Sequence, residues 1–226
     1  MKKSDQNKLT SCSVDVIDVF KSFDQRQVLK NLNLKIEKGQ GVCVCGANAS
    51  GKTTILKIIS GLIAADKGGV GINGIEIKKN PERVKKQIGV VFHEPMIYDH
   101  LTVDENLKFF ASLFNVTNSN KRINYLLELT GLTSYRNEHA AILSQGMLQR
   151  LSIARAMLHE PSVILADEPF SGLDKKAANK LISIFLEFKK SGGTFLMTTH
   201  NVNFAFDCCD RIAVLDSCKI IFNNKY

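Results

Sequence analysis

The run from Gly46 to Thr53 has residue types and a spacing that suit the binding of phosphate groups. It reads Gly46-Ala47-Asn48-Ala49-Ser50-Gly51-Lys52-Thr53 and is followed by Thr54. Glycines let backbone N–H groups wrap around phosphates at the start of a helix, where the helix dipole favours anions. We expect Lys52 to reach the β- and γ-phosphates and the Thr53 hydroxyl to bind Mg²⁺. This segment therefore predicts a nucleotide-binding site that includes Thr54.

Two carboxylates stand at the end of a short apolar run farther along the chain. Asp167 and Glu168 directly follow Val163-Ile164-Leu165-Ala166. A strand that ends in two acidic residues holds them rigidly, and we expect them near the phosphate loop. Asp167 is the expected partner of Mg²⁺, through water, and Glu168 the general base that polarises an attacking water. An acidic pair at a strand end is often only solvated, but its place behind a phosphate loop favours catalysis.

The elements around these motifs alternate between apolar, β-branched runs and stretches with helical periodicity. This alternation predicts an α/β fold with a parallel or mixed sheet covered by helices. The predicted strands are 13–20, 28–36, 41–45, 88–92, 163–166, 195–199 and 212–215. The predicted helices are 52–63, 121–129, 145–159 and a helix face at 181–188, with a further helix starting at the capping-box sequence Thr102-Val103-Asp104-Glu105. Gly68-Gly69 and Asn73-Gly74 predict a short hairpin.

The composition is that of an ordinary globular protein, with 226 residues of which 44% are hydrophobic and 23% charged. No apolar run reaches eighteen residues, so we expect no membrane-spanning helix. The first residues lack the apolar segment of a secretory signal, so the cytosol is the expected compartment. The net charge of +8 comes from scattered lysines such as Lys78-Lys79 and Lys189-Lys190. Such doublets favour solvated helix faces over a surface for nucleic acid or membrane.

The six cysteines lack the paired spacing of a metal site. Cys43 and Cys45 lie two apart on a predicted strand, so they share a face and pack as small apolar residues. Cys208 and Cys209 are adjacent and could be redox-active, but in a cytosolic chain reduced thiols are expected. We assign the cysteines no function.

A further set of motifs resembles those of the ABC (ATP-binding cassette) ATPases. The sequence Leu143-Ser144-Gln145-Gly146-Met147 is similar to the signature motif of that family. Ser171-Gly172-Leu173-Asp174 lies at the distance of the family's D-loop, and a simple helix N-cap at Asp174 is compatible with that role. His200 ends a predicted strand in the place of the family's switch histidine. Together the motifs run from Phe23 to His200 in the family's order and cover nearly the whole chain.

The resemblance implies roles for these residues. Ser144 and Gly146 would contact the γ-phosphate of ATP bound to the opposite subunit, through N–H groups at a helix start. Ser171 and Asp174 would line the dimer interface, while His200 would contact the γ-phosphate and position the water. The commonest signature of the family is Leu-Ser-Gly-Gly-Gln, and this chain departs from it at positions 145 and 147.

Two more positions are assigned by the same resemblance. Phe23 lies where the family places an aromatic ring that stacks on adenine, and Phe20 is its rival. His93, in Val91-Phe92-His93-Glu94-Pro95, takes the place of the family's usual glutamine. That glutamine senses Mg²⁺ and water and links the site to the membrane subunit. We therefore expect His93 at the catalytic and metal site.

The fold implied by the resemblance is that of a phosphate-loop NTPase of the ABC ATPase type. It has a RecA-like α/β core, an N-terminal antiparallel β subdomain and an inserted helical subdomain. A single ATP-binding domain would span 1–226. The core and β subdomain would occupy about 1–92 and 161–226, and the helical signature subdomain 93–160.

The function implied by the resemblance is that of an ATPase subunit of a membrane transporter, with ATP and Mg²⁺ as cofactors. Two subunits, expected to be identical, would close around two ATP molecules and drive a separate polytopic permease at the cytoplasmic face of the membrane. His93, the string 101–107 and Gln145-Gly146-Met147 are most similar to ATPases of the haem-exporter type, which act in cytochrome c maturation. Export is therefore the expected direction.

Two other functions can be weighed against this one. A cytosolic ABC ATPase acting on DNA or ribosomes is the main alternative. DNA-repair members carry long coiled coils between phosphate loop and signature, whereas the segment between Thr53 and Leu143 has no sustained heptads. Translation-factor members carry two cassettes, and this chain has one. An unrelated phosphate-loop enzyme, such as a small kinase, leaves Ser144, Gly146 and His200 unexplained.

Overall fold

A six-stranded sheet forms the centre of the fold in the computed structural model, which describes residues 12–200 and 202–225. Its spatial order is β10 (Lys219–Lys225), β9 (Arg211–Asp216), β3 (Gly41–Cys45), β8 (Thr194–Thr199), β7 (Val163–Asp167) and β6 (Ile88–Val91). The strands from β9 to β6 are parallel, and β10 is antiparallel to β9. The carboxyl ends of β3, β8 and β7 therefore meet at one edge of the sheet.

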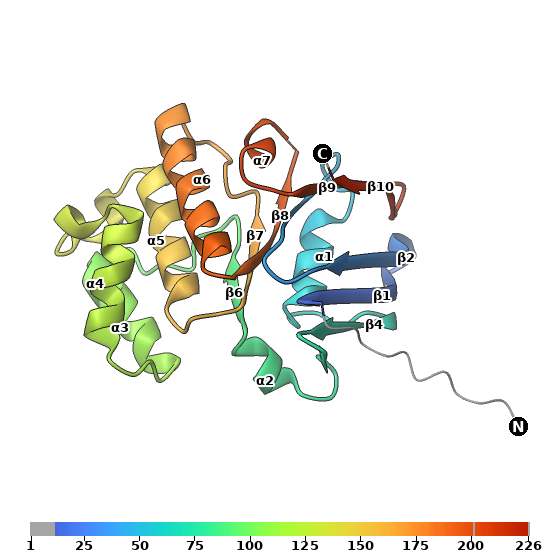
Figure 1. Cartoon of the computed structure of the whole chain (residues 1–226), viewed down its shortest axis with the longest axis horizontal. Helices are drawn as coiled ribbons and strands as arrows, with labels where there is room; N and C mark the ends of the chain where they lie inside the picture. The colour runs from blue at the N-terminus through green and yellow to red at the C-terminus, as the bar shows by residue number, and fades with distance from the viewer. Residues whose placement is uncertain (1–11, 201, 226) are drawn as a thin grey trace, which may run out of the picture.

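A second, antiparallel sheet lies beside the first (Figure 1). Its order is β2 (Arg26–Ile36), β1 (Val14–Phe23), β4 (Lys67–Ile72) and β5 (Ile75–Glu76). The turn between β4 and β5 is the predicted Asn73-Gly74 pair, and both residues have positive φ, 47° and 76°. This conformation suits a two-residue hairpin turn and confirms the prediction.

Helices cover the two faces of the six-stranded sheet. Helix α1 (Lys52–Ile59) lies on the side of the antiparallel sheet, and α3 (Val103–Leu113), α4 (Ser119–Thr130), α5 (Gln145–Met157) and α6 (Lys175–Lys190) gather on the other side (Figure 1). The short elements are α2 (Pro81–Lys85), η1 (Thr133–Tyr135), η2 (Ala140–Ile142) and α7 (Asn203–Phe206). Alternate strand residues enter separate cores: Val42 and Val44 pack with α1, while Cys43 packs with the other helices. The predicted α/β architecture with an N-terminal antiparallel sheet is confirmed.

The helix predicted over 52–63 is wrong at its end, because α1 stops at Ile59. Gly61 takes a left-handed conformation with φ 74°. The N–H groups of Gly61 and Leu62 turn back to the carbonyls of Ile58 and Lys57, in the manner of a glycine-terminated helix. Leu62, which lies within the predicted helix, is 59% exposed.

The predicted capping box at the start of α3 is confirmed. The Thr102 hydroxyl accepts from the N–H of Glu105, and the Glu105 carboxylate accepts from the N–H of Thr102. The other predicted strands and helices are present with shifts of a few residues at their ends, as is usual for such boundaries. No prediction covered β10.

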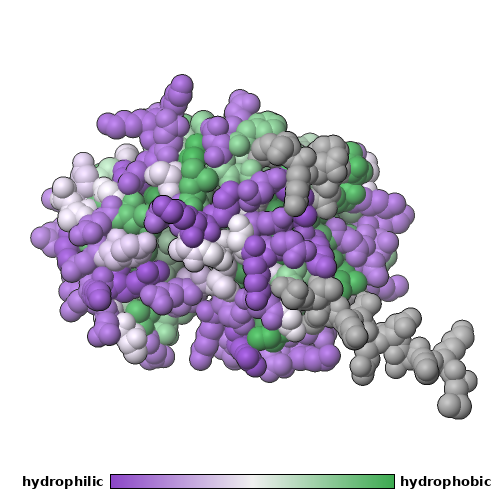
Figure 2. Space-filling model, viewed as in Figure 1, coloured by the Kyte–Doolittle hydropathy of each residue, from purple (hydrophilic) through white to green (hydrophobic). Residues whose placement is uncertain are grey.

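The surface in the view of Figure 2 is largely hydrophilic, with hydrophobic residues in separate patches. Within residues 12–200 and 202–225, no helix has both the length and the apolar character that a membrane crossing requires.

Asn106 fastens α3 to the segment that follows β6. Its side chain is fully buried. Its Oδ1 accepts from the N–H of Tyr98 at 2.9 Å, and its Nδ2 donates to the carbonyls of Tyr98, Leu101 and Thr102. One amide thus satisfies several backbone groups of a loop that lacks regular structure of its own.

We predict that Asn106→Ala lowers the free energy of unfolding by roughly 1–3 kcal/mol, because the Tyr98 N–H loses its acceptor. Urea unfolding measures the change. Asn120→Ala, at an exposed position of α4, is the control and should stay within about 0.5 kcal/mol of the parent chain. Equal destabilisation by both substitutions would contradict the anchoring role of Asn106.

Candidate active site

The phosphate loop joins β3 to α1 and has a backbone that only small or flexible residues can adopt. Ala49 and Gly51 have left-handed φ values of 61° and 107°. A Cβ atom on Gly46 would lie 2.4 Å from the carbonyl oxygen of Leu215 and 2.8 Å from Ser50 Oγ. The glycine at position 46 is therefore required by close packing against β9, as well as by the motif.

The amino-terminal end of α1 is suited to an anion. Gly51, the N-cap residue, supplies no side-chain cap, and the first turn contains no acidic residue. The buried Ser50 Oγ has no hydrogen-bond partner among the residues that the structure describes. Unsatisfied donors at a helix start, where the dipole is positive, are what phosphate oxygens bind. The loop therefore fits the phosphates of a nucleotide.

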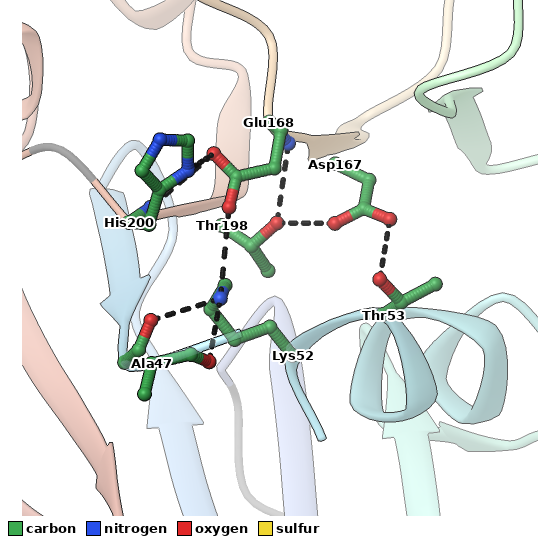
Figure 3. A network of polar contacts seen from close by, with 8 residues as sticks. Ala47, Lys52, Thr53, Asp167, Glu168, Thr198 and His200 are labelled. Carbon is green, nitrogen blue, oxygen red and sulfur yellow. Dashed lines mark hydrogen bonds and ion pairs between the residues drawn. The ribbon is translucent and has the colours of Figure 1, made fainter. Parts of the chain in front are cut away.

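Lys52 lies at the centre of the polar network in Figure 3. Its Nζ donates to the carbonyls of Gly46 and Ala47 at 2.9 and 3.0 Å and lies 3.6 Å from Glu168 Oε1. The side chain is almost fully buried. The phosphate loop thus holds the Lys52 ammonium group against the loop's own carbonyls, next to the Glu168 carboxylate that follows β7.

Asp167, at the end of β7, is 3% exposed and bound by two hydroxyls. Thr53 Oγ1 donates to Asp167 Oδ2 at 2.7 Å, and Thr198 Oγ1 donates to Oδ1 at 2.5 Å (Figure 3). The predicted pairing of Asp167 with the phosphate loop is therefore present. A buried carboxylate beside a hydroxyl is the oxygen donor set that Mg²⁺ prefers. Thr198 was not singled out from the sequence, although its place two residues before His200 could have indicated it.

Glu168 follows β7 in a left-handed conformation, φ 49°. Its N–H donates to Thr198 Oγ1 at 3.2 Å. Its Oε2 lies 3.0 Å from His200 Nδ1 and accepts from the His200 N–H at 3.2 Å (Figure 3). The structure thus brings Glu168, His200 and Lys52 together, as their order in the sequence predicted. A carboxylate oriented in this way can accept a proton from a water molecule.

A cavity of about 610 Å³ opens beside the phosphate loop. It is lined by Phe23, Asp24, Gln25, Arg26, Val28, Ala49, Gly51, Lys52, Thr53 and Thr54. Phe23 is 46% exposed there, with Lys21 Nζ 5.2 Å from its ring centre. Phe20 is not among the lining residues, so the geometry favours Phe23 for stacking. The turn residues Asp24 and Gln25 were missed, because they carry no pattern in the sequence.

The signature and D-loop residues cap two neighbouring helices. The Ser144 hydroxyl accepts from the N–H of Met147 at the start of α5, and Asp174 accepts from the N–H of Ala177 at the start of α6. The predicted N-cap at Asp174 is therefore present. Among the described residues, no hydrogen bond or ion pair connects Ser144 or Asp174 to the network of Figure 3.

His93 lies on the exposed segment after β6. Within the described part of the chain, the structure gives it no hydrogen bond and no ion pair, so it is not drawn into the network around Asp167 and Glu168. Among the residues that the structure describes, no three or more His, Cys, Asp or Glu side chains form a cluster that could hold a metal ion. The cysteines lie largely in the core, where burial raises the pKa of Cys45, and neighbouring thiols and burial raise that of Cys209.

The chain is similar to known ATP-binding proteins. A family model described as ABC transporter matches residues 29–171. The ABC transporter ATP-binding protein NatA of Bacillus subtilis (strain 168) is 34% identical, over 88% of this chain and 83% of its own length. The spermidine/putrescine import ATP-binding protein PotA of Fusobacterium nucleatum is 37% identical over 92% of this chain. The chain spans 56% of PotA, about half of its length.

Solved structures of ATP-binding cassettes are also similar to this chain. The dimeric, post-hydrolysis structure of the ATP-binding cassette MJ0796 bound to ADP and Pi superimposes with a TM-score of 0.84 at 30% identity. The match covers 94% of this chain and 98% of that one. An ATP-binding subunit of an ABC transporter superimposes with a TM-score of 0.85 at 29% identity, over 94% of this chain and 89% of its own.

We predict that Thr198→Val lowers nucleotide turnover by about 10- to 150-fold, because a hydrogen bond to a charged group contributes roughly 1.5–3 kcal/mol. Valine has the same shape but cannot donate to Asp167. Turnover measured against Mg²⁺ concentration should also show a higher requirement for the metal. Thr133→Val, at an exposed position of η1, is the control. Unchanged turnover and Mg²⁺ dependence in the Thr198 variant would refute the role of this threonine.

Proposed function

Since the chain belongs to the ABC transporter family of ATP-binding proteins, we propose that it is the ATPase subunit of a membrane transporter. It is an ATP-hydrolysing enzyme that uses ATP and Mg²⁺. The observation that carries the proposal is the joining of the phosphate loop to two carboxylates and a histidine, through Thr53–Asp167 and Lys52–Glu168. The free energy of hydrolysis would move a separate, polytopic permease.

The residues of the phosphate loop would hold the nucleotide. Residues 46–53 and Thr54 would bind the phosphates, and Phe23 would stack on the base at the exposed side of the cavity. Thr53 and Asp167 would hold Mg²⁺, directly and through water. When bound, Mg²⁺ neutralises charge on the phosphate oxygens. Thr198 holds Asp167 in place by donating a hydrogen bond to its Oδ1.

Glu168 would act as the general base. Its Oε2 is held by the backbone and ring of His200, and its Oε1 faces Lys52. His200 would orient the attacking water beside the γ-phosphate. Because three strand ends and a helix start fix these groups, little rearrangement is needed when the reaction begins.

A second copy of the chain would complete each site. Ser144 and Gly146 would contact the γ-phosphate held by the opposite subunit, and Ser171 and Asp174 would line the interface. The Ser144 hydroxyl can accept from the Met147 N–H and still donate to a phosphate oxygen, because a hydroxyl does both. The partner subunit is proposed to be identical.

The permease would dock on the segment 93–160, which we propose as the helical signature subdomain, with 1–92 and 161–226 as the core. A groove of about 220 Å³ beside α5 supports this placement. Exposed apolar side chains of Leu62, Met96 and Phe114 line it. His93 lies in the same connecting segment as Met96 and would couple the groove to the metal site. The subunit would then sit at the cytoplasmic face of the membrane.

We also propose export as the direction of transport. This rests on the similarity of His93, the string 101–107 and Gln145-Gly146-Met147 to ATPases of the haem-exporter type. One relative, 30% identical over 90% of this chain and 66% of its own length, is the linearmycin resistance ATP-binding protein LnrL of Bacillus subtilis (strain 168). A resistance function is compatible with export. The cargo would be set by the permease.

We predict that Glu168→Gln binds Mg-ATP, loses hydrolysis and accumulates as a dimer, because an amide cannot take the proton from water. Size-exclusion chromatography with and without Mg-ATP measures the dimer. A variant that stays monomeric at saturating Mg-ATP, even beside its permease, would refute the shared site.

We predict different defects for Lys52→Ala and Ser144→Ala. The lysine variant should lose nucleotide affinity, since its cation contacts the phosphates in the same chain. The serine variant should keep affinity and lose turnover by about 10²–10³-fold, typical of one lost charge-stabilising contact. Titration with a fluorescent ATP analogue and steady-state hydrolysis separate the two. An equal loss of affinity in both variants would show that Ser144 does not serve the opposite site.

A further inference from the structure

The starts of α5 and α6 are packed so closely that only small residues fit between them. A Cβ atom on Gly146 would lie 3.0 Å from Ala177 Cβ, in the first turn of α6. The signature glycine therefore also allows the D-loop helix to approach α5. The two helix starts are therefore close neighbours.

Gln145 is the residue at which this chain departs from the commonest signature, and its side chain reaches the D-loop. Its Nε2 donates to the carbonyl oxygen of Ser171 at 3.2 Å. Gly172 has a left-handed φ of 70°, and a Cβ there would lie 2.6 Å from Gln145 Nε2 and 2.7 Å from its Oε1. The D-loop turn is thus shaped around the amide group.

The D-loop is joined in turn to the catalytic carboxylate. The N–H of Ser171 donates to the carbonyl of Glu168 at 3.0 Å. Phe170, between them, is buried against the rings of Phe185 and Phe204. The short turn from Glu168 to Ser171 is therefore firmly packed, and Gln145 holds its outer end.

We propose that Gln145 is a positioning residue that fixes the D-loop, and through it Glu168, to the start of the signature helix of the same chain. The proposal rests on the proposed function, in which Ser144 serves the nucleotide of the opposite subunit. Closure of Ser144 on that nucleotide would then set the backbone that carries this chain's own Glu168. A glycine at position 145 would have no side chain to make this connection.

Substitution of Gln145 by glutamate tests the connection without changing the size of the side chain. Glutamate lacks the N–H donor and would place a carboxylate oxygen against the Ser171 carbonyl. Asn120→Asp makes the same change from amide to carboxylate in the first turn of α4, at an exposed position, and controls for the effect of charge at a helix start.

The measurements are kcat and KM for Mg-ATP, the melting temperature, and hydrogen exchange of the peptide 168–174 in the full chain. Gln145→Glu should lower kcat by about 2- to 10-fold, the range for one hydrogen bond, with KM unchanged. Exchange in 168–174 should become faster, and melting should not change. Asn120→Asp should behave like the parent chain.

Parental kcat and exchange in Gln145→Glu would overturn the proposal, as would equal changes in Asn120→Asp. When hydrogen exchange is measured without nucleotide, its result does not require dimer formation, because the connection from Gln145 to Ser171 lies within one chain. If Glu168→Gln fails to dimerise, the shared site is refuted, while exchange in Gln145→Glu still decides whether the amide holds the D-loop.

Discussion

The parallel pairing of β3, β8 and β7 is the constraint on which the site depends. Register places Cys45 beside Thr199 and Thr198 beside Asp167, so the phosphate loop, the histidine segment and the acidic pair all leave the sheet at one edge. The short Thr198–Asp167 hydrogen bond joins two of these strand ends, and Thr53 joins Asp167 to α1. Alternate side chains of the same strands fill two cores, which makes a slip in register costly. The catalytic geometry is therefore stabilised by the packing of the whole sheet.

A second constraint joins the signature helix to this sheet. Arg155 of α5 is 93% buried (7% exposed), and burial lowers the pKa of its guanidinium to about 10, so that it is still protonated at neutral pH. It donates to the carbonyl of Val90 on β6 and lies over the ring of Phe110. A buried cation is tolerated only with such partners. Helix α5 is thus held to the core at one end, while Gln145 holds the D-loop at the other.

Much of the local structure followed from the sequence. The Asn73-Gly74 turn, the capping box at Thr102 and the strand Gly41–Cys45 are set by short-range chemistry: turn dihedral angles, a reciprocal side-chain cap and a bounded apolar run. The phosphate-loop residues were predictable for the same reason, since their motif is contiguous. Local reasoning failed where a helix has to end: the apolar period continued through Leu62, but Gly61 took a left-handed conformation and turned the chain outward.

The tertiary structure alone decided which distant residues meet. The sequence by itself determined the phosphate loop, the acidic pair and the order of the motifs, because each is encoded within a few consecutive residues. Three placements depend on contacts between segments far apart in the chain. Thr198 bonds both Asp167 and Glu168, Phe23 rather than Phe20 lines the cavity, and Gln145 contacts the D-loop. Such contacts arise from sheet register and helix packing, which are set by the burial of the whole core and leave no pattern in a short stretch of residues.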